Sequence, residues 1–87
     1  MKIEWTAKAK KDALYWYKKD KNIYKKIKDL IAEIEETPFT GTGNPEPLKY
    51  NLKGWWSRRL NKKDRLVYRV SGKTPQLLEI ASCKGHY

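Results

Sequence analysis

The sequence predicts an α+β domain of two layers, in which two N-terminal helices pack on one face of an antiparallel sheet. Apolar side chains recur at helical spacing through residues 9–34, and a segment rich in Pro and Gly ends that pattern. From Trp55 onward, apolar and polar side chains alternate with the period of two that is typical of strands. The expected element order is β-α-α-β-β-β. A length of 87 residues leaves room for one domain, which we expect to span residues 1–87.

The N-terminal segment is expected to be a short strand over residues 2–5, because Ile3 and Trp5 alternate there with charged side chains. Thr6 is a good N-cap residue, since its hydroxyl can accept a hydrogen bond from the first turn of a helix. A first helix should therefore begin near Ala7.

A second, longer helix is predicted after Asp20, which offers another N-cap. Its apolar stripe consists of Ile23, Ile27, Leu30, Ile31 and Ile34. The helix should end near Thr37, because Pro38 disfavours helical geometry in the residue before it. Residues 38–48 are then expected to form an irregular surface loop that carries Glu46.

Three strands of an antiparallel meander are expected over residues 55–60, 65–70 and 76–83. In the middle strand the face that packs on the helices should carry Leu66, Tyr68 and Val70, and the opposite face should carry Arg65, Val67 and Arg69. The adjacent Arg58 and Arg59 must point to opposite faces. We expect one of them to pair with an acidic side chain.

The charge balance limits the function classes. Twenty Lys and Arg against ten Asp and Glu give a formal net charge of +10, which attracts polyanions such as nucleic acid, an anionic membrane or an acidic protein. A merely soluble basic surface is the alternative.

No apolar run approaches the roughly 20 residues that span a bilayer, and the N-terminus lacks the apolar stretch of a signal peptide. A cytoplasmic protein without membrane contact is therefore expected.

Cysteine and histidine are too few for a zinc cluster, since the chain has one of each. No carboxylate cage for a hard metal is visible either, and we expect chemistry without a metal or other cofactor. A lone Cys83 indicates a reducing compartment, where the thiol should be a small apolar filler of the core.

RNA cleavage is chemistry that needs no metal, because the 2′-hydroxyl of RNA is itself a nucleophile. It requires a base for the hydroxyl proton, an acid for the leaving 5′-oxygen and cations for the phosphate. Glu46 is the candidate base, and His86, with an ordinary pKa of about 6.5, is the candidate acid. The candidate cations are Arg58, Arg59 and Arg65, since the planar guanidinium donates two parallel hydrogen bonds to a phosphate.

Each of these candidates also has an interpretation that assigns it no function. His86 would then be a solvated residue of the tail, and Glu46 would be a loop carboxylate without a task. Lysines also crowd the two predicted helices, where they would form a solvated face. The aromatic side chains of the helices are expected in the core or at a contact between two copies of the chain. Tyr87 differs from them, because a terminal aromatic beside His86 has little core to join.

Taken together, four motifs closely resemble the YoeB toxins of the RelE superfamily, and the likeness covers essentially the whole chain. The motifs are G-x-G-x-P-E-P-L-K within residues 37–49, W-S-R-R within 52–59, R-L-V-Y at 65–68 and the closing H-Y at 86–87. In combination they are far more specific than any single motif. The resemblance implies a microbial ribonuclease-like fold and cleavage of mRNA in the A site of the 70S ribosome. It also implies neutralisation by a cognate antitoxin of the YefM or Axe type, and a second copy of the chain is a further candidate partner.

The resemblance also implies roles for single residues. Glu46 would be the general base, Arg65 the phosphate-stabilising cation with help from Arg59, and His86 the general acid. Tyr87 would position the substrate. Lys49 falls where the family keeps a lysine near the scissile phosphate.

One departure precedes the R-L-V-Y motif: many relatives have an acidic residue and a histidine where this chain has Lys63 and Asp64. The rival hypothesis is a basic RNA- or DNA-binding module without catalysis, in which the terminal histidine is incidental. That hypothesis explains the charge. It does not explain a loop carboxylate such as Glu46, which would repel RNA.

Overall fold

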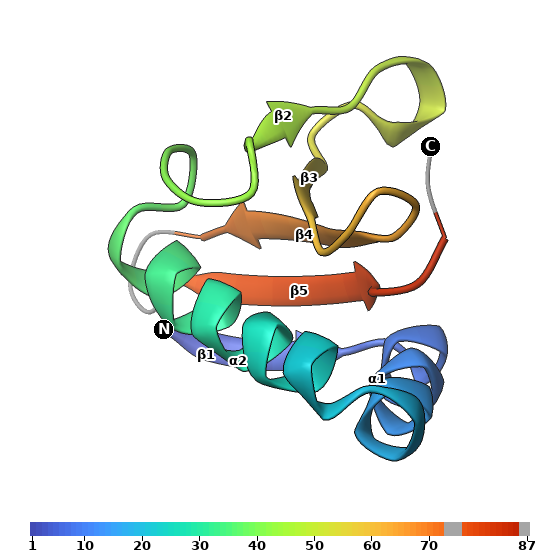
Figure 1. Ribbon diagram of the computed structural model, residues 1–87. Coiled ribbons are helices and arrows are strands. Elements are labelled where there is room, and N and C mark those ends of the chain that lie inside the picture. The colour runs from blue at the N-terminus through green and yellow to red at the C-terminus, as the bar shows by residue number, and fades with distance from the viewer. Residues whose placement is uncertain (73–75, 86–87) are drawn as a thin grey trace.

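The computed structural model describes residues 1–72 and 76–85. Its helices are α1 (Ala7–Lys19), α2 (Lys21–Glu36) and the short 3-10 helix η1 (Tyr50–Leu52). Its strands are β1 (Lys2–Trp5), β2 (Glu46–Pro47), β3 (Trp56–Arg59), β4 (Arg65–Ser71) and β5 (Leu77–Ser82). The strands form one sheet in the order β1-β5-β4-β3-β2, and α1 and α2 lie on one side of it (Figure 1). The predicted α+β class is therefore confirmed.

The helix boundaries follow the predicted caps. Thr6 Oγ1 accepts a hydrogen bond from the backbone N–H of Ala9 at 3.0 Å, and Asp20 Oδ1 accepts from Asn22 and Ile23 at 3.0 and 3.3 Å. These bonds satisfy N–H groups that have no partner inside the first turn. Helix α2 ends at Glu36, one residue before the predicted limit. No helix of the described ranges is both long enough and apolar enough to cross a membrane.

The core lies between the helices and one face of the sheet, as the alternation in the sequence predicts. It contains Ile27, Leu30, Ile31 and Ile34 of α2, Leu66 and Tyr68 of β4, and Leu78 and Ile80 of β5. Val70 packs at the edge of this cluster. Cys83 is fully buried in the core, and burial raises the pKa of its thiol to about 12, which makes it the inert filler that the sequence predicts.

The prediction of a wholly antiparallel sheet is wrong in one respect, because β1 pairs with β5 in the parallel direction. Strands β3, β4 and β5 do form the predicted antiparallel meander. Alternation identifies β1 as a strand but carries no information on its partner or direction. Thr6 fixes this arrangement, since its backbone N–H donates to the carbonyl of Ile80 at 3.0 Å and its hydroxyl donates to that of Ala81 at 2.7 Å.

The segment expected to be an irregular loop ends in a short strand. Glu46 and Pro47 pair with Ser57 and Trp56 as strand β2 at the edge of the sheet. Proline is tolerated at an edge, where its missing N–H costs no hydrogen bond in the ladder. Glu46 is thus part of the sheet and not of a free loop.

A single buried arginine organises the loop that precedes β2. Arg58 of β3 is 0% exposed, and its guanidinium donates to Glu33 Oε1 at 2.6 Å, to the Thr37 carbonyl at 2.8 Å and to the Thr40 carbonyl at 2.9 Å. Arg58 Nε also donates to the hydroxyl of Tyr68 at 3.2 Å. Arg58 is therefore the member of the adjacent pair that has an acidic partner, as expected.

Two glycines allow the loop to pass this close to Arg58. Gly41 has a φ of +120°, and a Cβ atom there would collide with Glu33 Oε1. Gly43 has a φ of +86°, and its carbonyl accepts from the backbone N–H of Arg59 at 2.7 Å. Both positions need the left-handed backbone region that glycine adopts without steric cost. The loop is thereby fixed on β3 at both ends.

Glu33→Gln is expected to lower the free energy of unfolding at neutral pH. In the variant this free energy should also fall less steeply as the pH is lowered. The pKa of the Glu33 carboxyl lies below its ordinary value of 4.5, chiefly because the backbone N–H of Thr42 donates to it, with Arg58 adding to the effect. Its stabilising contribution is therefore complete above about pH 4.5 and is lost as the pH falls through the lowered pKa. Urea unfolding from about pH 7 to pH 3 measures this, with the exposed Glu35→Gln as control. Parallel curves for wild type and Glu33→Gln would contradict the prediction.

Candidate functional site

The sheet register brings the predicted base and the predicted cations to the same face. Glu46 pairs with Ser57, and Ser57 pairs with Val67, so these three form one row across β2, β3 and β4. Arg59 pairs with Arg65 in the next row on that face. Residues two positions apart on a strand share a face, so Glu46 is a diagonal neighbour of Arg59.

Glu46 is exposed, and its carboxylate is held by a neighbour in the chain. Asn44 Nδ2 donates to Glu46 Oε1 at 2.7 Å. Asn44 has a φ of +53°, a conformation that asparagine tolerates better than most residues. This contact occupies one carboxylate oxygen. The other has no hydrogen-bond partner within residues 1–72 and 76–85, so the carboxylate can accept a proton from a bound molecule.

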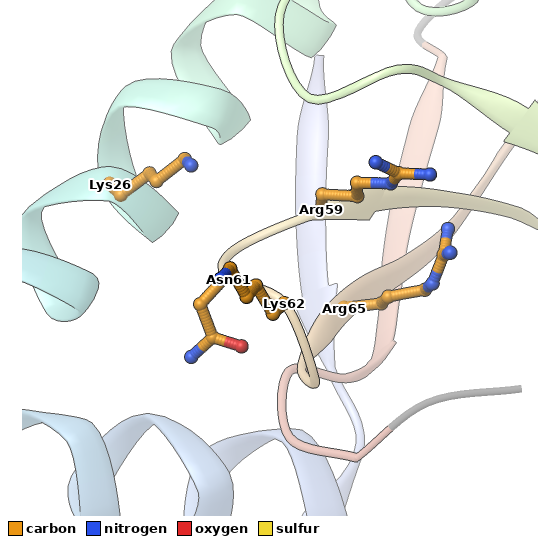
Figure 2. A pocket seen from close by; sticks show the side chains of 5 residues that line it. All are labelled: Lys26, Arg59, Asn61, Lys62 and Arg65. Atoms are coloured by element: carbon orange, nitrogen blue, oxygen red, sulfur yellow. The ribbon is translucent and has the colours of Figure 1, made fainter.

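Arg59 and Arg65 present two positive charges side by side. Arg65 Nη1 donates to Ser57 Oγ at 3.4 Å, which is a long contact. No carboxylate lies in salt-bridge distance of either guanidinium among the described residues. The two side chains start from neighbouring strands and extend toward the same side (Figure 2). Their mutual repulsion is relieved when an anion binds between them.

The other two arginines of the chain are neutralised. Arg69 lies on the same face as Arg65, but its Nε and Nη2 donate to Glu79 Oε1 at 3.0 and 2.8 Å. Its Cζ also lies 4.4 Å from the centre of the Trp55 ring. Arg58 points to the helix side and pairs with Glu33. Among the four arginines of the chain, Arg59 and Arg65 are therefore the two that have no carboxylate partner within the described residues.

Two pockets adjoin this face. A pocket of about 460 Å³ is lined by Lys26, Arg59, Asn61, Lys62 and Arg65 (Figure 2), and all of its charged lining residues are cations. A second pocket of about 390 Å³ is lined by residues 46–52. Glu46 and the predicted binding residue Lys49 therefore share a pocket. The first pocket suits an anionic group such as a phosphate.

The chain returns to this site at its C-terminal end. The backbone N–H of Arg65 donates to the carbonyl of Gly85 at 2.9 Å. Gly85 is the last residue that the structure describes, and the predicted site residues His86 and Tyr87 lie outside the described residues. Of the six predicted site residues, the structure thus brings Glu46, Arg59 and Arg65 to one sheet face and places Lys49 in the pocket that Glu46 lines.

Three polar residues at the site were missed in the sequence. Asn44 holds Glu46, Ser57 receives the hydrogen bond from Arg65, and Asp64 accepts from the backbone N–H of Gly85 at 2.8 Å. Asn44 has a local signal, because an asparagine two residues before a carboxylate can reach it. Ser57 and Asp64 have none, since their contacts depend on strand pairing. The described residues include no group of three or more His, Cys, Asp or Glu that could hold a metal ion.

Known proteins share this fold over the full chain. A YoeB/ParE toxin from Agrobacterium tumefaciens is 46% identical, with a TM-score of 0.96 and complete coverage of both chains. The YoeB of Staphylococcus aureus is 41% identical both as a dimer and in a heterotetrameric complex with YefM, with TM-scores of 0.90 and 0.88. Both alignments cover all of this chain and 98% of the other. The fold is therefore that of the small RelE-like toxins.

The sequence comparisons narrow this class to one family. The model of the YoeB-like toxin of bacterial type II toxin–antitoxin systems matches residues 5–87. Toxin YoeB of Escherichia coli K12 is 51% identical over 87 residues, which is the full length of both chains. The chain belongs to the YoeB-like toxins of type II toxin–antitoxin systems, as the motifs in its sequence indicate.

Opposite stability effects are expected for two arginine substitutions on the site face. Arg59→Gln removes one of two facing like charges and should leave the free energy of unfolding unchanged or raise it by up to about 1 kcal/mol. Arg69→Gln removes the partly exposed pair with Glu79 and the contact with Trp55, and should lower it by about 1 kcal/mol. Urea unfolding at low salt measures both. A comparable loss in Arg59→Gln would show that Arg59 is structural and not held ready for an anion.

Proposed function

We propose that the chain is an endoribonuclease that cleaves mRNA in the A site of the 70S ribosome and so inhibits translation. The observation that supports this most is the sheet face on which the exposed carboxylate of Glu46 adjoins Arg59 and Arg65. Membership of the YoeB-like toxins agrees with it. The toxin unit is residues 1–87.

The reaction uses groups that the sheet face presents. The Glu46 carboxylate takes the proton of the 2′-hydroxyl, and the 2′-oxygen attacks the adjacent phosphorus. The bond from phosphorus to the 5′-oxygen breaks, which leaves a 2′,3′-cyclic phosphate and a 5′-hydroxyl. Arg65, helped by Arg59, stabilises the negative charge that gathers on the phosphate oxygens. This route needs no metal ion, because the substrate supplies the nucleophile and the arginines supply the positive charge.

His86 is the general acid that protonates the leaving 5′-oxygen. An imidazole with an ordinary pKa of about 6.5 is suited to donate a proton near neutrality. The residue before it, Gly85, is hydrogen-bonded to the backbone of Arg65, so the chain leaves the described region beside the phosphate-binding cation. Tyr87 positions the substrate.

Lys49 and Arg59 bind the RNA backbone around the reacting phosphate. Lys49 shares a pocket with Glu46, and Arg59 lines the cationic pocket with Arg65. A net charge of +10 adds a long-range attraction for the ribosome. These contacts act on the phosphate backbone and carry no sequence preference of their own.

A cognate antitoxin of the YefM or Axe type neutralises the toxin. The Staphylococcus aureus relative forms a complex with YefM and is also known as a dimer. We expect an acidic antitoxin segment to cover Arg59 and Arg65, since these two facing arginines have no carboxylate partner within the described residues. A homodimer is a second assembly that we propose for this chain. A cytoplasmic location follows from this proposal, because the ribosome is the proposed place of action.

Glu46→Gln should lower the single-turnover rate of mRNA cleavage on programmed ribosomes by about 10²- to 10⁴-fold, the usual contribution of a general base. Affinity for the ribosome should stay the same or rise, because a negative charge near RNA is removed. Primer extension on a translated mRNA measures the cleavage, and cosedimentation with ribosomes measures the affinity.

Glu4→Gln is the matched control, since Glu4 is an exposed strand glutamate at the opposite edge of the sheet. It should leave both quantities unchanged. If Glu46→Gln cleaves and binds as well as wild type, Glu46 is not the base. A wild-type chain that binds ribosomes but cleaves no mRNA would instead fit a basic RNA-binding module without catalysis.

A further inference from the structure

Asp64 lies in the turn between β3 and β4, and a network of hydrogen bonds orients its carboxylate. Asn61 Oδ1 accepts from the backbone N–H groups of Lys63 and Asp64 at 2.8 and 2.7 Å. Asn61 Nδ2 donates to Asp64 Oδ2 at 2.9 Å. One carboxylate oxygen is therefore held by the turn itself. The other oxygen, Oδ1, is left to bind a group outside the turn.

The group that Oδ1 binds is the backbone of Gly85. The Gly85 N–H donates to Asp64 Oδ1 at 2.8 Å, and the Gly85 carbonyl accepts from the backbone N–H of Arg65 at 2.9 Å. Asp64 and Arg65 thus hold the N–H and the carbonyl of Gly85, which lies 21 positions after Asp64 in the chain. The bond to the carboxylate is charge-assisted and therefore stronger than a neutral one. Gly85 adopts a φ of +94°, which glycine accepts without strain.

The segment before Gly85 is also anchored. Trp16 Nε1 donates to the carbonyl of Cys83 at 2.7 Å, and the Cys83 N–H donates to Asp12 Oδ2 at 3.1 Å. The ammonium of Lys84 lies 4.1 Å from the centre of the Tyr15 ring. The chain end is therefore attached to α1 at residues 83 and 84 and to the turn at residue 85. Asp64 supplies the last side-chain contact before His86.

We propose that Asp64 is a positioning residue that fixes the point from which His86 reaches the site. This rests on the proposed function, in which His86 donates the proton to the leaving oxygen. The Cα atom after Gly85 is about 3.8 Å from that of Gly85, whatever conformation follows. With Gly85 fixed beside Arg65, the point from which residue 86 extends is fixed as well. Without Asp64, the hydrogen bond between the Arg65 N–H and the Gly85 carbonyl must hold Gly85 alone, so the position of Gly85 is less well fixed.

Asp64→Ala should lower the single-turnover cleavage rate on programmed ribosomes by about 10- to 100-fold, the scale of loss for a misplaced catalytic group. In a His86→Ala background the same change should have no further effect, because Asp64 acts through His86. An equal loss in both backgrounds, or no loss in wild type, would overturn the proposal.

Asp64→Asn separates position from charge. It is combined with Asn61→Asp, because the new –NH2 group of residue 64 would otherwise face the donor Asn61 Nδ2. In this double variant the amide oxygen of residue 64 can still accept from the Gly85 N–H, so cleavage should be nearly as fast as in wild type although residue 64 lacks the negative charge. If it behaves like Asp64→Ala, the charge matters and the positioning role is wrong. Asp29→Ala removes an exposed carboxylate of α2 and should change nothing.

A readout that does not depend on cleavage tests the contact directly. Hydrogen exchange of the Gly85 amide, followed by NMR on the folded full chain, should be slow in wild type and in the double variant Asn61→Asp, Asp64→Asn, and markedly faster in Asp64→Ala. Equal exchange in all three would overturn the proposal. A wild-type chain that protects the Gly85 amide but cleaves no mRNA on ribosomes would contradict the proposed function, and with it the role of Asp64 in delivering His86. Cleavage by wild type that Asp64→Ala leaves unchanged would overturn the inference on Asp64 alone.

Discussion

The buried guanidinium of Arg58 is the interaction on which the site depends. It joins β3 to Glu33 of α2 and to the carbonyls of the following loop, while its Nε bonds the Tyr68 hydroxyl. A charge in the core is tolerated because all of its partners are oxygens in good geometry. This loop leads directly into β2. The position of Glu46 on the sheet face is therefore set by an arginine that points to the opposite face.

Strand alternation and ion pairing separate the four arginines of the chain into two that have acidic partners and two that have none in salt-bridge distance among the described residues. Arg58 serves the core and Arg69 is paired with Glu79, whereas Arg59 and Arg65 face each other and have no carboxylate in salt-bridge distance among the described residues. Two facing like charges destabilise the sheet slightly. Natural proteins often retain such local costs at the places where they bind or react. The unpaired arginines and the nearby carboxylate of Glu46 thus lie on one sheet face, although they come from three strands.

Much of this could be predicted from the sequence, because caps and alternation are local signals. Thr6 and Asp20 gave the helix starts, and the period of two gave the faces of β4. The parallel pairing of β1 and the short strand at Glu46 could not be predicted, since pairing joins residues far apart in the chain. For the same reason the sequence reveals single candidates such as Glu46 and Arg65 but not the contacts that orient them. Asp64 looks like an ordinary turn residue until Gly85 is placed beside it.

Glu46 and Arg59 are exposed on the sheet face, so the site is open. Such a site presents reactive groups but makes few contacts that could hold a flexible substrate in one conformation. In-line attack needs an aligned 2′-oxygen, phosphorus and leaving oxygen, and such alignment can be worth effective molarities of about 10⁵ M or more. We infer that the ribosome supplies this alignment. The most direct test is the single-turnover cleavage rate of one mRNA, free and programmed on ribosomes, at one salt concentration and saturating protein. A far higher rate on ribosomes is predicted, and equal rates would contradict the account.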